Sequence, residues 1–152
     1  MKKNILDNQT AHEVVERIRK IQPSANPQWG SMTATEMFYH TNEVLRRTMM
    51  LPPLQPKKST LKQILLKTYF MNFAPRFPKN VEAPKFVNMK KNNFQLEGFE
   101  QERNKLIERV NEFQQSQNEF APNHPIFGRL TKKQWGVFSW MHLDHHLRQF
   151  NV

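Results

Sequence analysis

The sequence predicts an all-α fold, a four-helix bundle with a long crossover between the second and third long helices. Four stretches repeat their apolar residues at helical spacing, and no stretch of convincing length alternates as a β-strand does. A basic segment that follows several prolines separates the second stretch from the third. Four long helices with one long connection form a known bundle topology, and 152 residues suit a single domain, residues 1–152.

The first helix is expected over residues 10 to about 21, where apolar side chains gather on one side. The second is expected from Thr33 to about residue 50. Thr33 and Glu36 have the spacing of a capping box, in which each side chain bonds the main-chain N–H of the other. His40 lies on the edge of the apolar stripe of this helix. The stripe comprises Met37, Thr41, Val44, Leu45, Thr48 and Leu51.

The crossover is the most basic part of the chain. Residues 57–91 hold nine Lys or Arg against one acid, Glu82, and so carry +8 of the net charge of +10. The segment also contains five aromatic residues, and a short helix is expected near residues 59–73. Two interpretations stay open. The segment is a solvated connection whose aromatic side chains pack onto the body, or it is a basic, aromatic-lined lid over a site for an anionic substrate.

The third long helix is expected over residues 97–117, where apolar positions recur at spacings of four and three. Residues 118–129 contain two prolines and a glycine and are expected to form a loop. Thr131 and Gln134 repeat the capping-box spacing, which predicts the start of a fourth helix that runs to about Gln149.

Three of the six histidines lie within five residues of the fourth helix. At about 100° per residue, His142 and His146 lie one above the other and point inward, which is the spacing of a metal site. His145 lies about 80° to one side and Asp144 faces the opposite way, towards solvent. Ser139 is small and leaves an opening beside the pair. The inward face comprises Trp135, Phe138, Ser139, His142, His146 and Gln149.

Two protein ligands hold an ion weakly, so a third is expected, with His40, His124 and His12 as the candidates. His40 is preferred, because the edge of the apolar stripe on the second helix brings it within reach of the fourth helix.

Glu36, Glu43 and Arg47 lie on the same helical face as His40. Either glutamate could orient the imidazole, and Arg47 could hold an anionic group of a substrate. A surface ion-pair ladder, above all Glu43 with Arg47, is the alternative that stays open.

The composition argues against several classes of protein. With no cysteine, the chain has no disulfide, no cysteine-ligated zinc and no thiol nucleophile of its own. The first ten residues lack the apolar stretch of a signal peptide, and no stretch approaches the roughly 20 apolar residues of a membrane span. We therefore expect a cytoplasmic protein with no membrane partner. No helix-turn-helix, zinc-finger or RNA-binding signature accompanies the positive charge, so nucleic acid is not the expected partner.

A pattern of residues extends along most of the chain and comprises Trp29 to Thr33 followed by His40, residues 124–131, and Gln134 to Gly136 leading into residues 142–150. This pattern resembles the DinB-like (YfiT-like) superfamily of metalloenzymes, and most of all an uncharacterised bacterial branch of it. The likeness covers nearly the whole chain, and its most specific part is the pair of histidines with His145 between them, followed by Arg148 and Gln149. Leu147 departs from the Arg-Gly-Gln of many members, and the basic crossover is longer.

The resemblance implies a four-helix bundle with a crossover after the second helix and a divalent metal held by His40, His142 and His146. His145 is not expected to bind the ion. Activities of the superfamily include metal-dependent transfer of low-molecular-weight thiols, thiol-dependent isomerisation and hydrolase-like chemistry.

The expected function is that of a divalent-metal-dependent S-transferase that uses a low-molecular-weight thiol. Zinc or nickel is the expected ion, with iron as a further candidate, and the ion would lower the pKa of a bound thiol or water. Arg47, Arg148 or the lysines of the crossover are expected to hold the carboxylates of the thiol cofactor. A hydrolase would instead need a general base, for which His145 and Glu43 are the candidates.

Other hypotheses stay open beside the transferase. The protein is a metal or small-ligand binder without turnover, or it binds nucleic acid through the crossover, which a salt titration would reveal. The expected partner is a small-molecule substrate, anionic if it uses the basic crossover, and a homodimer is left open.

Overall fold

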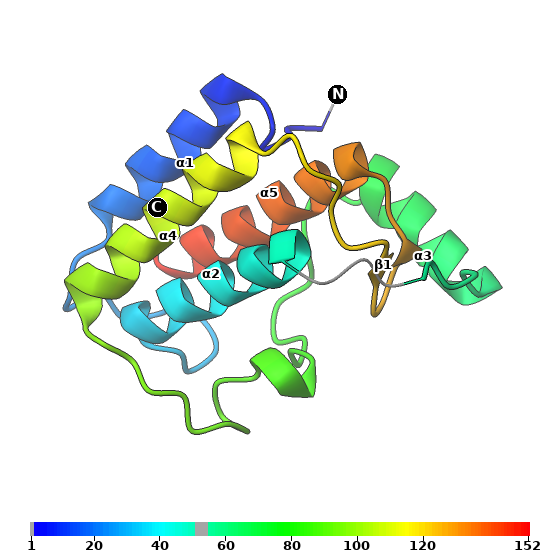
Figure 1. The fold of residues 1–152 in the computed structure, drawn as a ribbon. Helices are drawn as coiled ribbons and strands as arrows, with labels where there is room; N and C mark the ends of the chain where they lie inside the picture. Colours follow the sequence, from blue (N-terminus) through cyan, green and yellow to red (C-terminus); the bar gives the residue numbers. More distant parts are fainter. Residues whose placement is uncertain (1, 51–54) are drawn as a thin grey trace.

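The computed structural model describes residues 2–50 and 55–152, and most of them are helical (Figure 1). The prediction of a largely helical fold is confirmed, whereas Leu51 and the residues after it to position 54 lie outside the described part of the chain. The helices are α1 (Asn8–Lys20), α2 (Ala34–Met50), α3 (Leu61–Asn72), the 3-10 helix η1 (Lys85–Val87), α4 (Phe99–Gln115) and α5 (Lys132–Gln149).

Side-chain caps fix where several helices begin. Glu36 accepts a hydrogen bond from Thr33 N at 2.7 Å, while Thr33 Oγ1 accepts one from Glu36 N at 3.2 Å. The box of Thr131 with Gln134 starts α5 in the same way. Both predicted capping boxes are therefore confirmed. A third box, which was not predicted, pairs Thr60 with Gln63 at the start of α3.

The four long helices pack along one another around a common core. In Figure 1, α4 lies beside both α1 and α2, and α5 also contacts α1 and α2. α5 is buried on nearly all sides, because α3 covers part of it as well. None of the described helices is long and apolar enough to cross a membrane. Completely buried core side chains include Ile18, Phe38, Leu106, Phe113 and Leu147.

A small hairpin interrupts the segment that was predicted to be a loop. β1 (Asn123–His124) pairs antiparallel with β2 (Gly128–Arg129), and Gly128 takes the left-handed conformation with φ +65°. The turn needs glycine there, because other residues rarely adopt this φ. The hairpin also anchors the start of the crossover, since Arg129 N donates to Ser59 Oγ at 2.8 Å.

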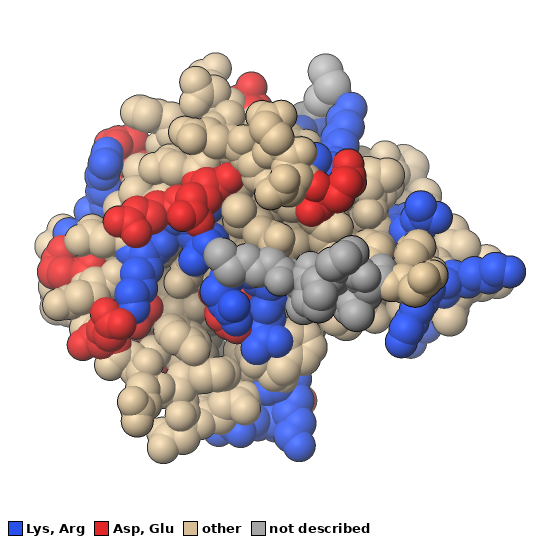
Figure 2. Space-filling model, viewed as in Figure 1, with Lys and Arg blue, Asp and Glu red and all other residues tan. Residues whose placement is uncertain are grey.

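The far end of α3 is held from the N-terminal segment. Lys2 Nζ donates to the Phe70 carbonyl at 2.5 Å and also to the Ala74 carbonyl, so an ammonium caps the carbonyl end of α3. Fixed at both ends, α3 projects beside the body (Figure 1). In the view of Figure 2, blue Lys and Arg side chains surround this end of the molecule, while most acidic side chains lie on the opposite half.

Candidate metal centre

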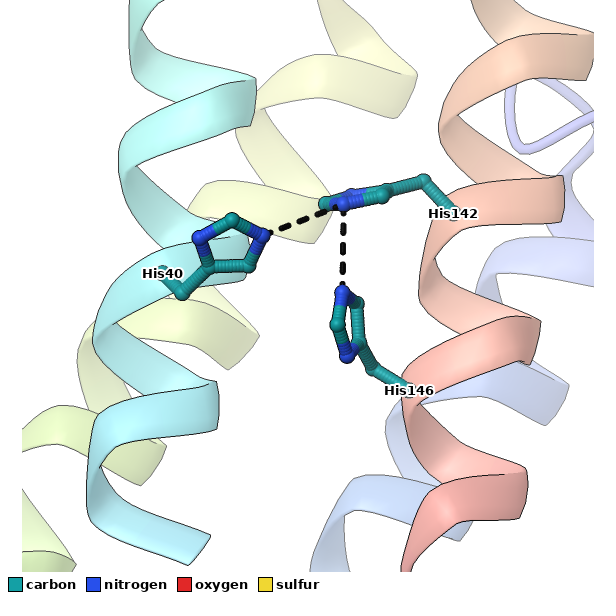
Figure 3. Close-up of side chains that lie close together, drawn as sticks. All are labelled: His40, His142 and His146. Carbon is teal, nitrogen blue, oxygen red and sulfur yellow. Dashed lines mark hydrogen bonds between the residues drawn. The ribbon is translucent and has the colours of Figure 1, made fainter. Parts of the chain in front are cut away.

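Three histidine side chains from two helices meet at one point between α2 and α5 (Figure 3). His40 Nε2 and His146 Nε2 each lie 3.2 Å from His142 Nε2. His142 and His146 stand on successive turns of α5, and His40 reaches across from α2. One nitrogen of each ring lies within 4.8 Å of the others, so the group could hold a metal ion. These are the three histidines that the sequence selected.

Two of the rings are oriented through their outer nitrogens. His40 Nδ1 lies 2.9 Å from the Val87 carbonyl, and His146 Nδ1 lies 2.9 Å from Gln149 Oε1. Gln149 Nε2 donates to the Trp29 carbonyl at 2.6 Å, which fixes the amide with its oxygen towards His146. Because both acceptors are oxygens, Nδ1 carries the hydrogen in His40 and in His146.

The three Nε2 atoms do not carry enough hydrogens to make both of their short contacts hydrogen bonds. A neutral imidazole with its hydrogen on Nδ1 presents a lone pair at Nε2, so His40 and His146 both point lone pairs at His142. His142 Nε2 carries at most one hydrogen and donates to only one of them. At least one 3.2 Å contact therefore joins two lone pairs. A cation among the three nitrogens turns this repulsion into attraction, so the residues fit a metal ion.

The spacing of the nitrogens also fits an ion. A tetrahedral ion about 2.0–2.1 Å from each imidazole nitrogen separates the nitrogens by roughly 3.3 Å. In the structure, His142 Nε2 lies 3.2 Å from each of the other two Nε2 atoms. Three neutral imidazoles leave the ion its full charge and leave coordination positions open, which is typical of catalytic rather than structural sites.

Burial keeps the three imidazoles in the form that binds metal. Removal from water lowers the pKa of His40 and holds the pKa values of His142 and His146 well below the ordinary histidine value. All three rings are consequently neutral near pH 7, and a neutral imidazole is the form that coordinates an ion.

His145 lies beside this group and outside it. Its ring centroid is 5.1 Å from that of His146 and 5.6 Å from Trp29, which meets it edge to face. Burial lowers its pKa, opposed in part by the main chain of Phe77. The structure thus places His145 on the wall next to the three ligand candidates.

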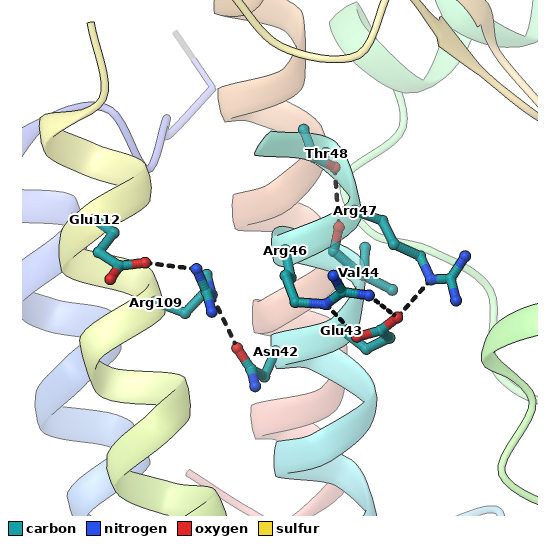
Figure 4. Close-up of polar contacts among 8 residues, drawn as sticks. All are labelled: Asn42, Glu43, Val44, Arg46, Arg47, Thr48, Arg109 and Glu112. Atoms are coloured by element: carbon teal, nitrogen blue, oxygen red, sulfur yellow. Dashed lines mark hydrogen bonds and ion pairs between the residues drawn. The ribbon is translucent and has the colours of Figure 1, made fainter. Parts of the chain in front are cut away.

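Neither of the two glutamates that were candidates for orienting His40 reaches it. Glu36 caps the start of α2, and the buried Glu43 accepts hydrogen bonds from Arg46 at 2.7 Å and Arg47 at 2.6 Å (Figure 4). The Val87 carbonyl occupies the orienting position instead. The ion-pair interpretation therefore describes Glu43.

Asp144 and Arg148 also differ from expectation. Asp144 is buried and does not face solvent, because α1 covers that side of α5 and Arg17 donates to its carboxylate at 2.9 Å. Arg148 Nε donates to the other carboxylate oxygen at 2.8 Å, and Arg148 does not line the cavity described below. The helical wheel treated α5 as having one solvent face, whereas helices cover it on several sides.

The other histidine candidates are not part of the group, although His124 lines the same cavity. His12 is exposed on α1. His124 Nδ1 accepts hydrogen bonds from Ile126 N at 3.0 Å and Phe127 N at 3.2 Å, which holds the turn of the hairpin. Burial lowers the pKa of His124 to about 4. Ser139 is buried but does not line the cavity, so the predicted opening does not lie beside it.

A cavity of about 800 Å³ opens onto the three histidines. One wall is α2, another is α5 with the hairpin, and the crossover from Phe77 to Lys91 forms a third. The crossover is packed onto the body through its aromatic rings. The ring centroids of Phe77 and Phe138 lie 5.9 Å apart, and the guanidinium carbon of Arg47 lies 5.1 Å from the ring centroid of Phe86. The segment therefore both packs on the body and covers the site.

Comparison with known families identifies the family of this chain. Residues 1–152 match the family described as protein of unknown function, DUF1569. The chain belongs to the DUF1569 family. Among curated proteins and solved structures, nothing matches it.

In this DUF1569 protein the groups that orient the ligand candidates were not among those predicted from the sequence. The carbonyls of Val87 and Trp29 are main-chain atoms, which no side-chain pattern reveals. Gln149 was placed on the inward face without a role. Its spacing from His146, three residues on the same helix, is a signal that could have suggested the contact.

Proposed function

We propose that this DUF1569 protein is a divalent-metal-dependent enzyme of the DinB-like type, with His40, His142 and His146 as ligands and a low-molecular-weight thiol as co-substrate. The observation that carries the proposal is the meeting of three Nε2 atoms on the wall of an 800 Å³ cavity. A site for a structural ion closes around it, whereas this group faces space for a substrate.

The helix packing supports the superfamily assignment. α1, α4, α2 and α5 contact one another in a closed ring, and the long crossover follows α2 (Figure 1). This is the arrangement expected of a four-helix bundle of the DinB-like type, with one ligand on the second long helix and two on the fourth.

The ion and the residues around it would have different roles at such a site. A bound divalent ion supplies positive charge that favours the thiolate form of a thiol or the hydroxide form of water. Val87 and Gln149 hold two of the rings in place. Because the chain has no cysteine, the thiol must come from a soluble molecule. Arg47 lines the cavity and is placed to meet the charge of an anionic ligand.

Metal analysis tests the first half of the proposal. Untagged wild-type protein should carry close to one equivalent of zinc, nickel or iron, and the His142→Ala variant should carry far less. If both carried equally little, the metal site would be refuted. Circular dichroism of the variant checks that the helices remain.

Cobalt substitution tests the second half. A thiol that binds through sulfur should add a charge-transfer band to the spectrum of the cobalt protein. If the spectrum of the metal-loaded protein did not change on addition of thiols, the result would instead support a hydrolase or a binder without turnover.

A further inference from the structure

We propose that the cavity takes an elongated, mainly apolar carboxylate, whose apolar body lies along the aromatic wall and whose carboxylate is held by Arg47. This inference names the substrate class for the site and rests on the proposed function. It places the charged group of the substrate away from the three histidines, towards the end of α2.

The apolar wall begins at the histidines themselves. The Phe138 ring stacks on His142 with centroids 5.7 Å apart, and Phe77 and Phe127 lie 5.9 and 6.0 Å from Phe138. Phe70 extends the cluster, 5.6 Å from Phe127. All of these phenylalanines line the cavity. A continuous aromatic surface of this kind binds an apolar body and offers few partners to a polar one.

Arg47 stands on the same face of α2 as His40, two turns further along. Seven residues advance a helix by about 10 Å and return almost to the same side. Thr48, the next residue, accepts a hydrogen bond on its carbonyl from Ala121 N, and Ala121 in turn accepts one from the Trp135 indole. Arg47 therefore lies towards the same end of the cavity as the start of α5, which is where the aromatic wall runs.

The guanidinium of Arg47 has donors to spare. Its ion pair with Glu43 uses only Nε, and Figure 4 shows the two terminal nitrogens directed away from that carboxylate. Glu43 is shared with Arg46, so two positive charges face one negative charge. The two terminal amino groups of an arginine form a planar fork that matches a carboxylate.

The crossover adds to this preference for an anion. Lys90 and Lys91 line the cavity together with one acid, Glu82, which pairs with Lys91. Together with Arg47, these lysines give the wall formed by α2 and the crossover an excess of positive charge. The wall formed by α5 is mainly apolar. One anionic group on an apolar body matches that division.

Binding of octanoate and of octanamide, its neutral counterpart, tests the inference. Trp29 and Trp135 line the cavity, so tryptophan fluorescence reports occupancy. Wild type should bind octanoate about tenfold more tightly than octanamide, because a charge-assisted hydrogen bond contributes roughly that much. Its affinity for octanoate should also exceed that for butanoate by roughly tenfold or more, because butanoate covers less of the aromatic wall.

Arg46→Gln is the matched control for Arg47→Gln. Both arginines pair with Glu43 and are similarly exposed, but only Arg47 lines the cavity. Arg47→Gln should lose the preference for octanoate over octanamide, and Arg46→Gln should keep it. If Arg47→Gln kept the preference, or if butanoate bound as tightly as octanoate, the inference would be wrong.

Repeating the titration on chelator-treated wild type separates this inference from the proposed function. The preference for the acid should survive removal of metal. If it disappeared with the metal and persisted in Arg47→Gln, the carboxylate would sit on the ion, which overturns the inference and leaves the metal site standing. Failure of the metal site would show in elemental analysis alone.

Discussion

At the scale of single residues, Gln149 connects two parts of the candidate site. Its oxygen accepts from His146 and its amino group donates to the Trp29 carbonyl, so one side chain orients a ligand and ties down the loop before α2. Partners of this kind fix the tautomer and direction of a metal-binding histidine.

Replacing Gln149 by leucine should therefore weaken metal affinity by about 10- to 100-fold, the usual effect of losing such a partner. Competition with a chromophoric chelator measures it. Gln101→Leu, an exposed change on α4, serves as the control and should leave the affinity unchanged. An unaltered affinity in a folded Gln149→Leu protein would show that the contact does not support the site.

His124 predicts a pH dependence of stability. Its folded pKa of about 4 lies below the ordinary value of 6.5, so the unfolded chain binds more protons between these values. The contribution of His124 to the free energy of unfolding is therefore fully present above about pH 6.5 and is lost as the pH drops towards 4. It falls by about 2 kcal/mol between pH 7 and pH 5.

His124→Asn should remove this part of the dependence and keep the turn, since an asparagine oxygen also accepts from main-chain N–H groups two and three residues on. Urea unfolding at the two pH values measures the difference between the proteins. Equal pH dependence in both would mean that His124 takes up a proton as readily in the folded as in the unfolded chain, which would contradict the lowering of its pKa by burial.

The three ligand candidates could be predicted from sequence because helical geometry is local. Positions i and i+4 face the same way on any helix, which places His142 above His146, and the edge of an apolar stripe directs His40 inward. The Val87 carbonyl could not be predicted, because every residue carries the same main-chain oxygen and only the tertiary path brings this one to His40.

At the scale of secondary-structure elements, the same distinction between local and distant causes applies. The helix starts were predictable from Thr33 with Glu36 and Thr131 with Gln134, because a capping box involves residues three apart. The hairpin was not, because each strand is two residues long and depends on contacts with the crossover. Asp144 was misplaced because coverage by α1 leaves no trace in the pattern of α5.

The bridge from Arg17 through Asp144 to Arg148 joins α1 to the end of α5. Asp144→Ala should lower the free energy of unfolding by roughly 2 kcal/mol, because the poorly exposed guanidinium of Arg17 loses its carboxylate partner and keeps only the Val152 carbonyl. Urea denaturation measures the loss. Glu16→Ala, which breaks an exposed pair with Arg19, should cost about 0.5 kcal/mol or less.

Metal content provides a second measurement on the same variant. Since Asp144 lies on the side of α5 covered by α1, Asp144→Ala should keep the metal content of wild type. Loss of the ion together with a normal stability would place the carboxylate in the site after all.

At the scale of the whole molecule, an ion between α2 and α5 should stabilise the fold, because it cross-links two of the long helices. A ligand present at about 100 times its Kd adds about 2.7 kcal/mol, which corresponds to roughly 5–10 °C in Tm for a chain of this size. Chelation should lower the Tm of wild type by that amount.

Variants at two histidines separate the site from surface binding. His40→Ala should show no metal-dependent shift in Tm, whereas His12→Ala, at an exposed position, should shift as wild type does. A shift of the same size in all three proteins would indicate binding elsewhere on the surface.

The contact between His40 and the Val87 carbonyl cannot be removed by a side-chain substitution, because the acceptor is a main-chain oxygen. Alanine at residue 87 would therefore remove a buried valine side chain and leave the carbonyl beside His40 in place. What the contact does constrain is the length and course of the segment between α3 and α4. Insertions or deletions there would move the oxygen while exchanges of side chain would not, so the site is sensitive to indels where it tolerates point mutations.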